Sequence, residues 1–368
     1  MISMEQKQRL TPPALKGRGA VTNDDSRRFN LPSRDADGDW LDERDALGDA
    51  SGKLRTQVTV ESPKSILSFN TSPDIPFDRS INAYRGCEHG CVYCYARPTH
   101  AYHDLSPGLD FETRLFAKPN AAQLLRDTLA KPTYRPAAIA IGTNTDPYQP
   151  IEKRYNITHQ ILEVMLETRH PVGITTKSNR VIDDREILAE LAALNLSAVA
   201  ISVTTLDRKI ARLLEPRAPS PAKRLQAVKD LRALGIPVHV NIAPVIPAIT
   251  DHELEALVAA AADHDAQSVS VIPVRLPHEV APLFEQWLEA HFPDRKNKVM
   301  HIIESLRSGK KNDPNFHSRM KGQGPWAELL HHRLSLAVRK NGLGKAKFSL
   351  RTDLFQRPIV RGSQMELF

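Results

Sequence analysis

Cysteine is scarce in this chain: it has three among 368 residues, and all three lie between positions 87 and 94. An odd number of cysteines at such close spacing excludes the disulfide framework of a small secreted protein. The scarcity instead agrees with a reducing compartment, where thiolates stay available to bind a metal. The three cysteines are therefore the first candidate for a functional site.

Long hydrophobic runs are also missing. No stretch approaches the roughly eighteen consecutive apolar residues of a membrane span, and the polar segment 1–17 lacks the apolar run of a signal peptide. These absences predict a cytoplasmic protein with no membrane partner. Hydrophobic residues still make up 41% of the composition, which is enough for the core of one large α/β domain with extensions.

Acidic residues become rare toward the C-terminus. Between Arg295 and Arg361, sixteen Lys and Arg stand against four Asp and Glu, a local balance of +12. The net charge is +7, so the rest of the chain sums to −5. Such a basic segment attracts phosphate backbones through counterion release. A nucleic acid partner is one interpretation, and a solvated basic face without a partner is the other.

The cysteines follow the pattern C-x3-C-x2-C, with Cys87, Cys91 and Cys94 as its members. Thiolates at this density predict a soft-metal site that holds zinc or an iron–sulfur cluster. Three thiolates can hold three irons of a four-iron cluster and leave the fourth iron open. Structural zinc needs a closed fourth position, which His89 could supply, but the loop lacks paired C-x2-C halves. The spacing favours the cluster, with zinc as the alternative.

Apolar strands and amphipathic helices alternate through the middle of the chain. Strands are expected at 137–141, 172–176, 198–203, 237–242 and 268–272, and helix starts at Asn120, Asn156, Asp183, Ser220 and Thr250. A short alternating strand is expected at 110–116. With a strand before Cys87, this gives six βα units around a parallel sheet. Six units are too few for a closed eight-unit barrel, so the prediction is an open, curved partial (β/α)6 barrel.

Four regions are predicted along the chain. Residues 1–55 have balanced charge and no sustained apolar period, which indicates a disordered or extended arm. Residues 56–290 form the barrel core, and residues 291–361 form a basic helical extension. Within the extension, segment 319–326 mixes cations, glycines and a tryptophan before a helix at 328–339. This part either grips phosphates and stacks on bases or packs on the open edge of the barrel. Residues 362–368 form a flexible tail.

Polar residues follow the predicted strands at their carboxyl ends, where open parallel sheets gather their ligands. They are Thr143 and Asp146, Lys177 and Ser178, Ser202 and Thr204, and then Asn241 and Arg275. Each alone is explained by turn chemistry or capping; together on one rim they predict a ligand site. Glu215-Pro216-Arg217 lies beyond the fourth strand and either lines a substrate opening or makes a surface ion pair.

The segment from Ser80 to Arg97, SINAYRGCEHGCVYCYAR, resembles the cluster loop of the radical S-adenosylmethionine (SAM) superfamily, including the aromatic Tyr93 before the third cysteine. With TNTDPYQP at 143–150, the chain is similar to the branch related to spore photoproduct lyase, over roughly residues 60–340. The resemblance implies the same partial barrel, a [4Fe-4S] cluster on the three cysteines and SAM as second cofactor. It also implies an electron donor such as flavodoxin or ferredoxin.

The resemblance further implies roles for the strand ends in SAM binding. The SAM contacts it implies are Tyr93, Thr143, Asp146, Lys177, Ser178, Ser202 and Thr204. Reduction of SAM would give a 5′-deoxyadenosyl radical that abstracts hydrogen from a substrate. Spore photoproduct lyases use a further cysteine as hydrogen donor, and this chain has no fourth. Thymine-dimer reversal by that route is therefore not expected, and Tyr148 or Tyr95 is the alternative relay.

The last five residues, QMELF, resemble the Q-x-x-L-F peptides by which bacterial repair and replication proteins bind the DNA sliding clamp. Gln364, Leu367 and Phe368 take the contact positions, on a free terminus suited to such a peptide. A chance apolar tail is the alternative. The sequence thus leaves three functions open: a radical SAM enzyme that repairs or modifies DNA or RNA, one that acts on a peptide or small molecule, and a non-enzymatic DNA-associated module with structural zinc.

Overall fold

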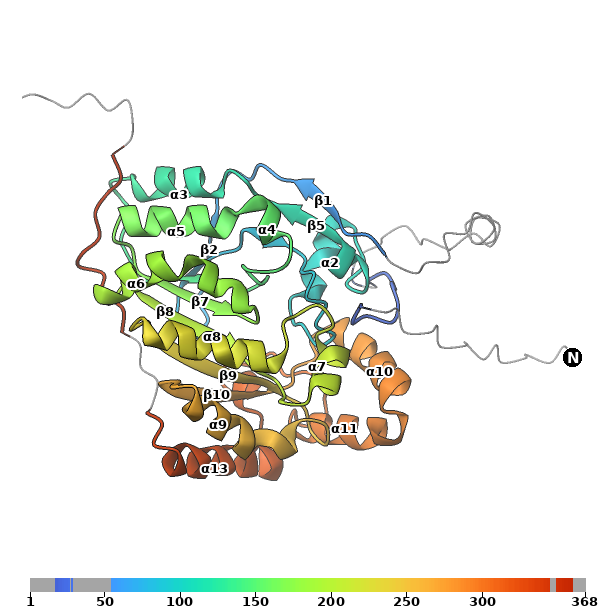
Figure 1. Cartoon of the computed structure of the whole chain (residues 1–368). Coiled ribbons are helices and arrows are strands. Elements are labelled where there is room, and N and C mark those ends of the chain that lie inside the picture. The colour runs from blue at the N-terminus through green and yellow to red at the C-terminus, as the bar shows by residue number, and fades with distance from the viewer. Residues whose placement is uncertain (1–16, 27, 29–53, 345–348, 360–368) are drawn as a thin grey trace, which may run out of the picture.

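A seven-stranded sheet forms the centre of the protein in the computed structural model, which describes residues 17–26, 28, 54–344 and 349–359 (Figure 1). The strand order is β10-β9-β8-β7-β6-β3-β2. All neighbours pair in parallel except β2, which is antiparallel to β3 at one edge. The strands are β2 (Leu67–Phe69), β3 (Arg79–Ile81), β6 (Ile139–Ile141), β7 (Val172–Thr176), β8 (Ser197–Ser202), β9 (Val238–Val245) and β10 (Ser268–Pro273).

The parallel strands form because their apolar side chains are buried in register. Ile174 on β7 pairs with Val199 on β8, and Ile201 on β8 pairs with Val240 on β9; all four are essentially inaccessible to solvent. The helices that connect parallel strands cover the sheet, so the side chains of these strands must be apolar to pack beneath them. The predicted parallel α/β core is confirmed: the five strands expected between residues 137 and 272 lie within three residues of the observed bounds of β6 to β10.

Amphipathic helices connect the strands and lie along one face of the sheet (Figure 1). They are α3 (Ala121–Leu129), α5 (Ile157–Glu167), α6 (Arg185–Ala193), α8 (Pro221–Ala233) and α9 (Leu254–Asp263). Shorter elements are α4 (Glu152–Tyr155), α7 (Arg208–Leu214), η1 (Arg97–His103), η2 (Asn179–Asp184) and η3 (Asp251–Glu253). Helix α5 shows how the connections pack: Ile157, Ile161 and Met165 share one buried face, as their helical spacing predicts.

Two helix starts, at Asp183 and Thr250, were predicted wrongly, because local hydrogen bonds to preceding residues use the expected capping groups. Asp183 lies inside η2, which is capped instead by Ser178, whose Oγ accepts the backbone N–H of Arg180 at 3.2 Å. Helix α6 starts only after that 3-10 turn. Likewise, the hydroxyl of Thr250 accepts the backbone N–H of Ile246 at 2.9 Å rather than capping α9. Asp183 and Thr250 thus lie in or before a 3-10 turn, and the helices α6 and α9 begin only after those turns.

A small second sheet carries the chain into the cysteine loop. Its order is β1 (Gln57–Val60), β5 (Arg114–Ala117) and β4 (Tyr84–Arg85). The strand predicted at 110–116 is wrong in its first half, since Asp110–Thr113 form the helix α2. The side chain of Asp110 accepts the backbone N–H of Ser106 at 3.0 Å, and Glu112 is fully buried in an ion pair. These contacts override the local alternating pattern.

Residues 17–26, here called the N-terminal strap, pack against the domain without regular secondary structure. Gly19, Ala20 and Val21 are buried, and the backbone N–H groups of Gly19 and Ala20 donate to Glu112 at 3.0 and 2.8 Å. The strap, which is part of the predicted disordered or extended arm, is thus held against the domain by these contacts. Most of the remaining predicted arm lies outside the described residues.

The C-terminal extension covers the β10 edge of the sheet. It follows α10 (Val280–His291) and contains α11 (Pro293–Ser305), α12 (Ser318–Lys321) and α13 (Gly324–Lys340). Helix α13 contacts β10 and α9, and Trp326 packs against the main core. The predicted helix at 328–339 thus packs on the open edge of the sheet. Within the described ranges, the structure has no helix of the length and apolarity needed to cross a membrane.

Residues 349–359 return along the loops that precede β6, β7 and β8 (Figure 1). The backbone N–H of Arg351 donates to Asn195 at 3.0 Å and that of Gln356 donates to Thr168 at 2.8 Å. These loops mark the amino ends of the strands, opposite the cysteine loop. The predicted clamp-binding residues, Gln364, Leu367 and Phe368, lie outside the described residues.

Candidate cofactor site

The cysteine loop follows β4 and is held by its own backbone turns. The N–H of Gly90 donates to the carbonyl of Cys87 at 3.3 Å, and the N–H of Cys94 to that of Cys91 at 3.2 Å. Cys87 and Cys91 are buried, Cys94 is half-buried, and all three are free thiols. Burial raises the pKa of both Cys87 and Cys91. The loop therefore presents thiols that need nearby positive charge to become thiolates.

A buried arginine beneath the loop fixes its backbone. The guanidinium of Arg97 donates to the carbonyls of Gly90 and Cys91 at 3.2 and 2.9 Å, and to two carbonyls of the segment before α2. It also pairs with Glu112 at 2.5 Å, and neither side chain is exposed. Because every donor points at backbone or at one carboxylate, Arg97 sets the shape of the loop between its first two cysteines.

The N-terminal strap closes over the same place. A Cβ atom on Gly19 would lie 1.8 Å from the carbonyl oxygen of Gly90, so only glycine permits this close backbone approach. The carboxylate of Glu112 accepts two strap N–H groups as well as Arg97. The cysteine loop, α2 and the strap are thus joined through one buried carboxylate.

The segment Glu215-Pro216-Arg217 holds the loop from the opposite side. The N–H of Val92 donates to the carbonyl of Leu214 at 3.2 Å, and the N–H of Arg217 to that of His89 at 3.3 Å. The guanidinium of Arg217 pairs with Glu88 at 2.9 Å. The surface ion-pair interpretation of this segment is wrong for Glu215, whose pair with Arg224 is about 1% exposed on both sides.

Glu215 is the centre of a polar network behind Tyr93. Its carboxylate accepts the phenol of Tyr93 and the hydroxyl of Thr204, the latter at 2.7 Å. Burial alone would raise the pKa of Glu215, but the charges of Arg224 and Lys177 lower it to about 2. The carboxylate is therefore ionised, and it fixes the ring of Tyr93. The ammonium nitrogen of Lys177 lies 5.8 Å from the centroid of that ring.

Asp146 serves the loop that follows β6. Its carboxylate accepts the hydroxyl of Thr176 and the backbone N–H of Lys177, both at 2.7 Å, and lies 3.4 Å from Nδ1 of His89. Burial raises the pKa of Asp146, but His89 and these donors lower it to about 2. His89 was considered above as a fourth zinc ligand. In the structure its Nδ1 atom lies beside the carboxylate of Asp146.

The other predicted residues divide into two groups. Thr143 lies on the rim, where its hydroxyl is 3.3 Å from the side-chain nitrogen of Asn82 and its carbonyl accepts the phenol of Tyr95. Ser178 and Ser202 are buried; the first caps η2 and the second ends β8. The structure thus joins Tyr93, Lys177 and Thr204 around one network, and it gives Ser178 a structural role.

Sequence reasoning missed the residues that support the site. Asn82 receives the backbone N–H of Asn144 at 2.9 Å and so links the ends of β3 and β6. Lys118 donates to the carbonyl of Asn82 at 2.9 Å. Arg97, Glu112 and Arg224 also carried no motif of their own. Only the position of Arg97, three residues after the last cysteine, was a signal that could have identified one of them.

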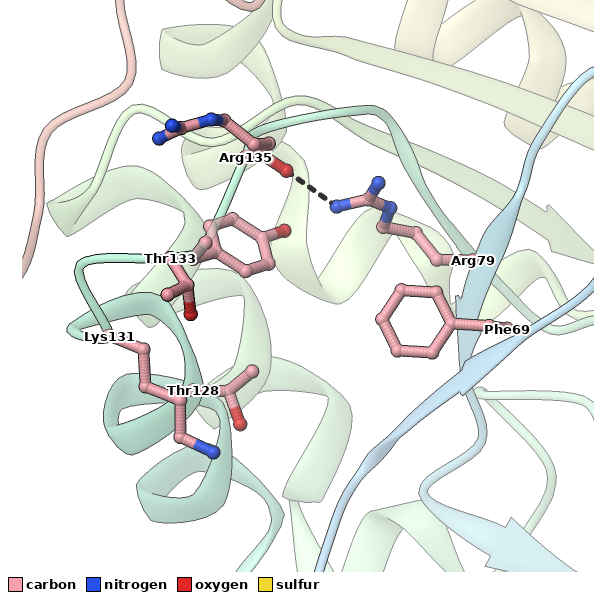
Figure 2. Close-up of a pocket in the computed structure, with 7 residues that line it drawn as sticks. Phe69, Arg79, Thr128, Lys131, Thr133 and Arg135 are labelled. Carbon is pink, nitrogen blue, oxygen red and sulfur yellow. Dashed lines mark hydrogen bonds between the residues drawn. The ribbon is translucent and has the colours of Figure 1, made fainter.

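A separate hollow of about 320 Å³ lies at the amino end of β3 (Figure 2). It is lined by Phe69, Arg79, Thr128, Lys131, Thr133, Tyr134 and Arg135. Figure 2 shows Arg79 donating to the carbonyl of Arg135, at 2.7 Å, and its remaining donors pair with Asp78. Arg79 is thus already paired with Asp78 and with a backbone carbonyl, and the hollow lies at the other end of β3 from the cysteine loop.

Comparisons with known proteins identify the class. The model of the radical SAM superfamily matches residues 81–261. Uncharacterized proteins of Mycobacterium bovis and Mycobacterium tuberculosis are each 36% identical over 249 residues, which cover 67% of this chain and 72% of theirs. The radical SAM Nalpha-GlyT isomerase of Pseudomonas phage M6 is 26% identical over 231 residues, 61% of this chain and 45% of that protein. The chain belongs to the radical SAM superfamily and is a radical SAM enzyme that uses SAM.

Solved structures place the fold more narrowly. Spore photoproduct lyase complexed with dinucleoside spore photoproduct aligns with a TM-score of 0.56 at 14% identity, over 77% of this chain and 79% of that chain. A mutant of the lyase with bound AdoMet, which is SAM, and the same dinucleoside aligns at 0.57 and 13% identity, over 82% and 91%. This chain therefore shares the fold of spore photoproduct lyase.

The radical SAM fold implies a [4Fe-4S] cluster, and the donor set of the cysteine loop fits one. Three free thiols lie in one loop, and the sequence has no fourth cysteine to close the site. In the part of the chain that the structure describes, no three or more His, Cys, Asp and Glu side chains form a group that could hold a metal ion. The match to the cluster is thus one of ligand chemistry and spacing.

Proposed function

We propose that Cys87, Cys91 and Cys94 bind a [4Fe-4S] cluster, and that the enzyme cleaves SAM reductively to act on a nucleic acid. The observation that carries the proposal is the cysteine loop itself, which follows β4, contains three free thiols and brings Tyr93 beside Thr204, just beyond the end of β8. When bound, the cluster and SAM supply the one-electron chemistry that breaks the sulfonium bond. The protein supplies binding, orientation and exclusion of water.

The backbone of the cysteine loop is held in place from two sides. Arg97 and Glu112 hold its backbone from one side, and Arg217 holds it from the other. None of these contacts uses a thiol, so all three sulfur atoms stay free for iron. Burial of Cys87 and Cys91 makes their thiolates costly without a neighbouring cation, and iron provides that charge.

SAM would lie along the strand ends that share the Glu215 network. Lys177 offers an ammonium group for a carboxylate, and Tyr93 offers a ring held by Glu215 next to the third cysteine. Thr204 has its hydroxyl in the same network. Four residues stay predicted SAM contacts: Thr143, Asp146, Ser178 and Ser202. The side chains of Asp146 and Ser178 already bind groups within the protein, so their backbone groups are more available to SAM than their side chains.

A nucleic acid is the substrate class best supported. The basic C-terminal segment suits phosphate. A lyase with the same fold has been solved with a dinucleoside photoproduct, and a relative is named as a Nalpha-GlyT isomerase. A peptide or small molecule is the competing substrate class. We further propose a small reducing protein, flavodoxin or ferredoxin, as electron donor.

Metal analysis and EPR of anaerobically reconstituted protein test the cofactor. We expect about four irons for each chain and a reduced four-iron signal that changes when SAM is added. Cys94→Ser should lose the signal, whereas Thr59→Ser on β1, outside the site, should keep it. Zinc alone in the wild-type protein would overturn the cofactor assignment.

Stimulation of SAM turnover tests the substrate class. Single-stranded DNA, duplex DNA, RNA and a mixed peptide library are compared at equal mass with the reduced enzyme, using methionine and 5′-deoxyadenosine as products. We expect a nucleic acid to increase their formation. Stimulation by peptides alone would contradict the substrate class but not the radical SAM chemistry.

A further inference from the structure

Arg275 is a cation without a carboxylate partner at the end of β10. Among the described residues it forms no ion pair, and its buried Nε has no hydrogen-bond partner. Its Nη1 contacts only the sulfur of Met320, at 3.1 Å. Burying a cation without a counter-ion is unfavourable, so its retention here calls for an explanation.

Neighbouring arginines increase the positive charge. Arg319 pairs with Asp74 through two contacts, at 2.6 and 2.7 Å. Arg307 is buried and donates to neutral carbonyls, including those of Ser318 and Arg319 at 3.0 Å. Burial and the charge of Arg319 together lower the pKa of Arg275. The acidic groups nearby are engaged elsewhere, and the charge of Arg275 is left for an outside anion.

The position of Arg275 connects this charge to the cofactor loop. Its guanidinium carbon lies 5.9 Å from the centroid of the Tyr95 ring. Tyr95 directly follows the third cysteine, and its phenol donates to the carbonyl of Thr143 at the end of β6. The residue Tyr95 as a whole is nevertheless 53% exposed. An aromatic surface and an unpaired cation therefore lie side by side next to the cysteine loop.

The segment that contains Arg319 and Met320 joins the two edges of the seven-stranded sheet. Met320 contacts Arg275, which follows the edge strand β10, and Arg319 binds Asp74 in the connection between β2 and β3 at the other edge. Tyr95 comes from the loop after β4 of the small sheet and lies beside Arg275. A substrate that enters between these edges would meet Arg275 and Tyr95 before it reached the cluster loop.

We propose that Arg275 binds a phosphodiester group of the nucleic acid substrate, while the Tyr95 ring stacks on an adjacent base. This inference rests on the proposed function. Guanidinium groups recognise phosphate through two parallel hydrogen bonds, and aromatic rings stack on bases of any sequence. A base inside a duplex cannot stack on a side chain, so the substrate is presented as an unpaired strand or an extruded nucleotide.

Binding of a short labelled oligothymidylate by fluorescence anisotropy tests the proposal with the reconstituted full chain. Arg275→Gln should weaken binding about tenfold, the effect of losing one bidentate phosphate contact. Arg275→Lys keeps the positive charge but loses the planar guanidinium that makes two parallel hydrogen bonds. Its affinity should lie between those of the wild type and Arg275→Gln. The matched control is Arg135→Gln, an exposed arginine shortly before β6, at the amino ends of the strands and outside the basic C-terminal segment. It removes the same charge and should change affinity less than about twofold.

Neutral oligonucleotides separate phosphate binding from packing. A methylphosphonate oligothymidylate lacks backbone charge, so the wild type and Arg275→Gln should bind it equally. The proposal is overturned if Arg275→Gln binds the charged oligonucleotide as well as Arg135→Gln does. It is also overturned if the substitution weakens binding of the charged and the neutral oligonucleotide equally, or if it weakens SAM binding instead. Iron content and the circular dichroism spectrum confirm that each variant is folded and loaded.

The outcome is distinguishable from failure of the proposed function. Wild-type protein that cleaves SAM but binds no oligonucleotide would refute the role of Arg275 and leave the radical SAM chemistry intact. Wild-type protein that binds the oligonucleotide through Arg275 but holds no iron–sulfur cluster would support the anion site and refute the proposed cofactor. RNA of matched sequence shows whether the sugar affects recognition.

Discussion

Replacing Arg97 with methionine should strongly destabilise the protein, because its charge is buried in the ion pair with Glu112. Removing one partner of a buried pair typically costs about 3–5 kcal/mol. The change also removes the donors to the carbonyls of Gly90 and Cys91, each worth about 1 kcal/mol. The strap N–H groups still solvate part of the Glu112 charge. We therefore expect a loss of about 4 kcal/mol in the free energy of unfolding.

Urea unfolding of the apo-protein, followed by circular dichroism, measures this loss. The control is Arg126→Met, since the pair between Arg126 and Glu167 is 37% and 44% exposed and should contribute about 0–1 kcal/mol. A double-mutant cycle with Glu112→Gln should show that the paired variant loses less than the sum of the single variants. Arg97→Met within about 1 kcal/mol of its control would refute the idea that this pair holds the cysteine loop.

Three further predictions follow from particular contacts. Gly19→Ala should destabilise the strap and lower iron retention, because its Cβ would strike the Gly90 carbonyl. The control Gly173→Ala should change neither property, since its Cβ would meet no atom within 4 Å. Equal iron contents of the two variants would contradict the role of the strap. Burial raises the pKa of Glu152 from 4.5 to about 7. The protonated group therefore contributes about 3 kcal/mol to the free energy of unfolding below pH 4.5, and this contribution is lost as the pH rises through 7. Glu152→Gln should flatten this part of the pH dependence of unfolding, and an unchanged profile would show that the group is not perturbed. Deleting residues 364–368 should abolish binding to the bacterial sliding clamp in surface plasmon resonance; equal binding before and after deletion, or none by the full chain, would reject the clamp peptide.

The parallel sheet could be predicted because its evidence is local. Runs such as 172–176 are apolar along their whole length and separated by helical periodicity, and β7 has the predicted bounds. The cysteine loop was equally visible, since its three ligands lie within eight residues. Resemblance to a known cluster loop then supplied the cofactors, which spacing alone had left between zinc and iron.

The support of the site could not be read in the same way. Glu112 contacts Gly19 and Ala20, more than ninety residues earlier in the chain, and no local pattern records such a contact. The pattern around Asp110 indicated a strand, but tertiary hydrogen bonds turned its first half into α2. The hydroxyl of Ser178, a residue predicted to contact SAM, also caps η2, and the sequence pattern did not indicate that cap. Buried polar pairs and caps depend on which distant groups meet, so they become visible only in the folded chain.

The account's central claim is that the loop of Cys87, Cys91 and Cys94 supports reductive cleavage of SAM. The most direct measurement is the yield of 5′-deoxyadenosine and methionine from the anaerobically reconstituted, reduced protein supplied with SAM. We predict both products from the wild-type protein and neither from Cys87→Ser, Cys91→Ser or Cys94→Ser. Absence of both products from a wild-type protein with an intact, reduced four-iron cluster would contradict the account.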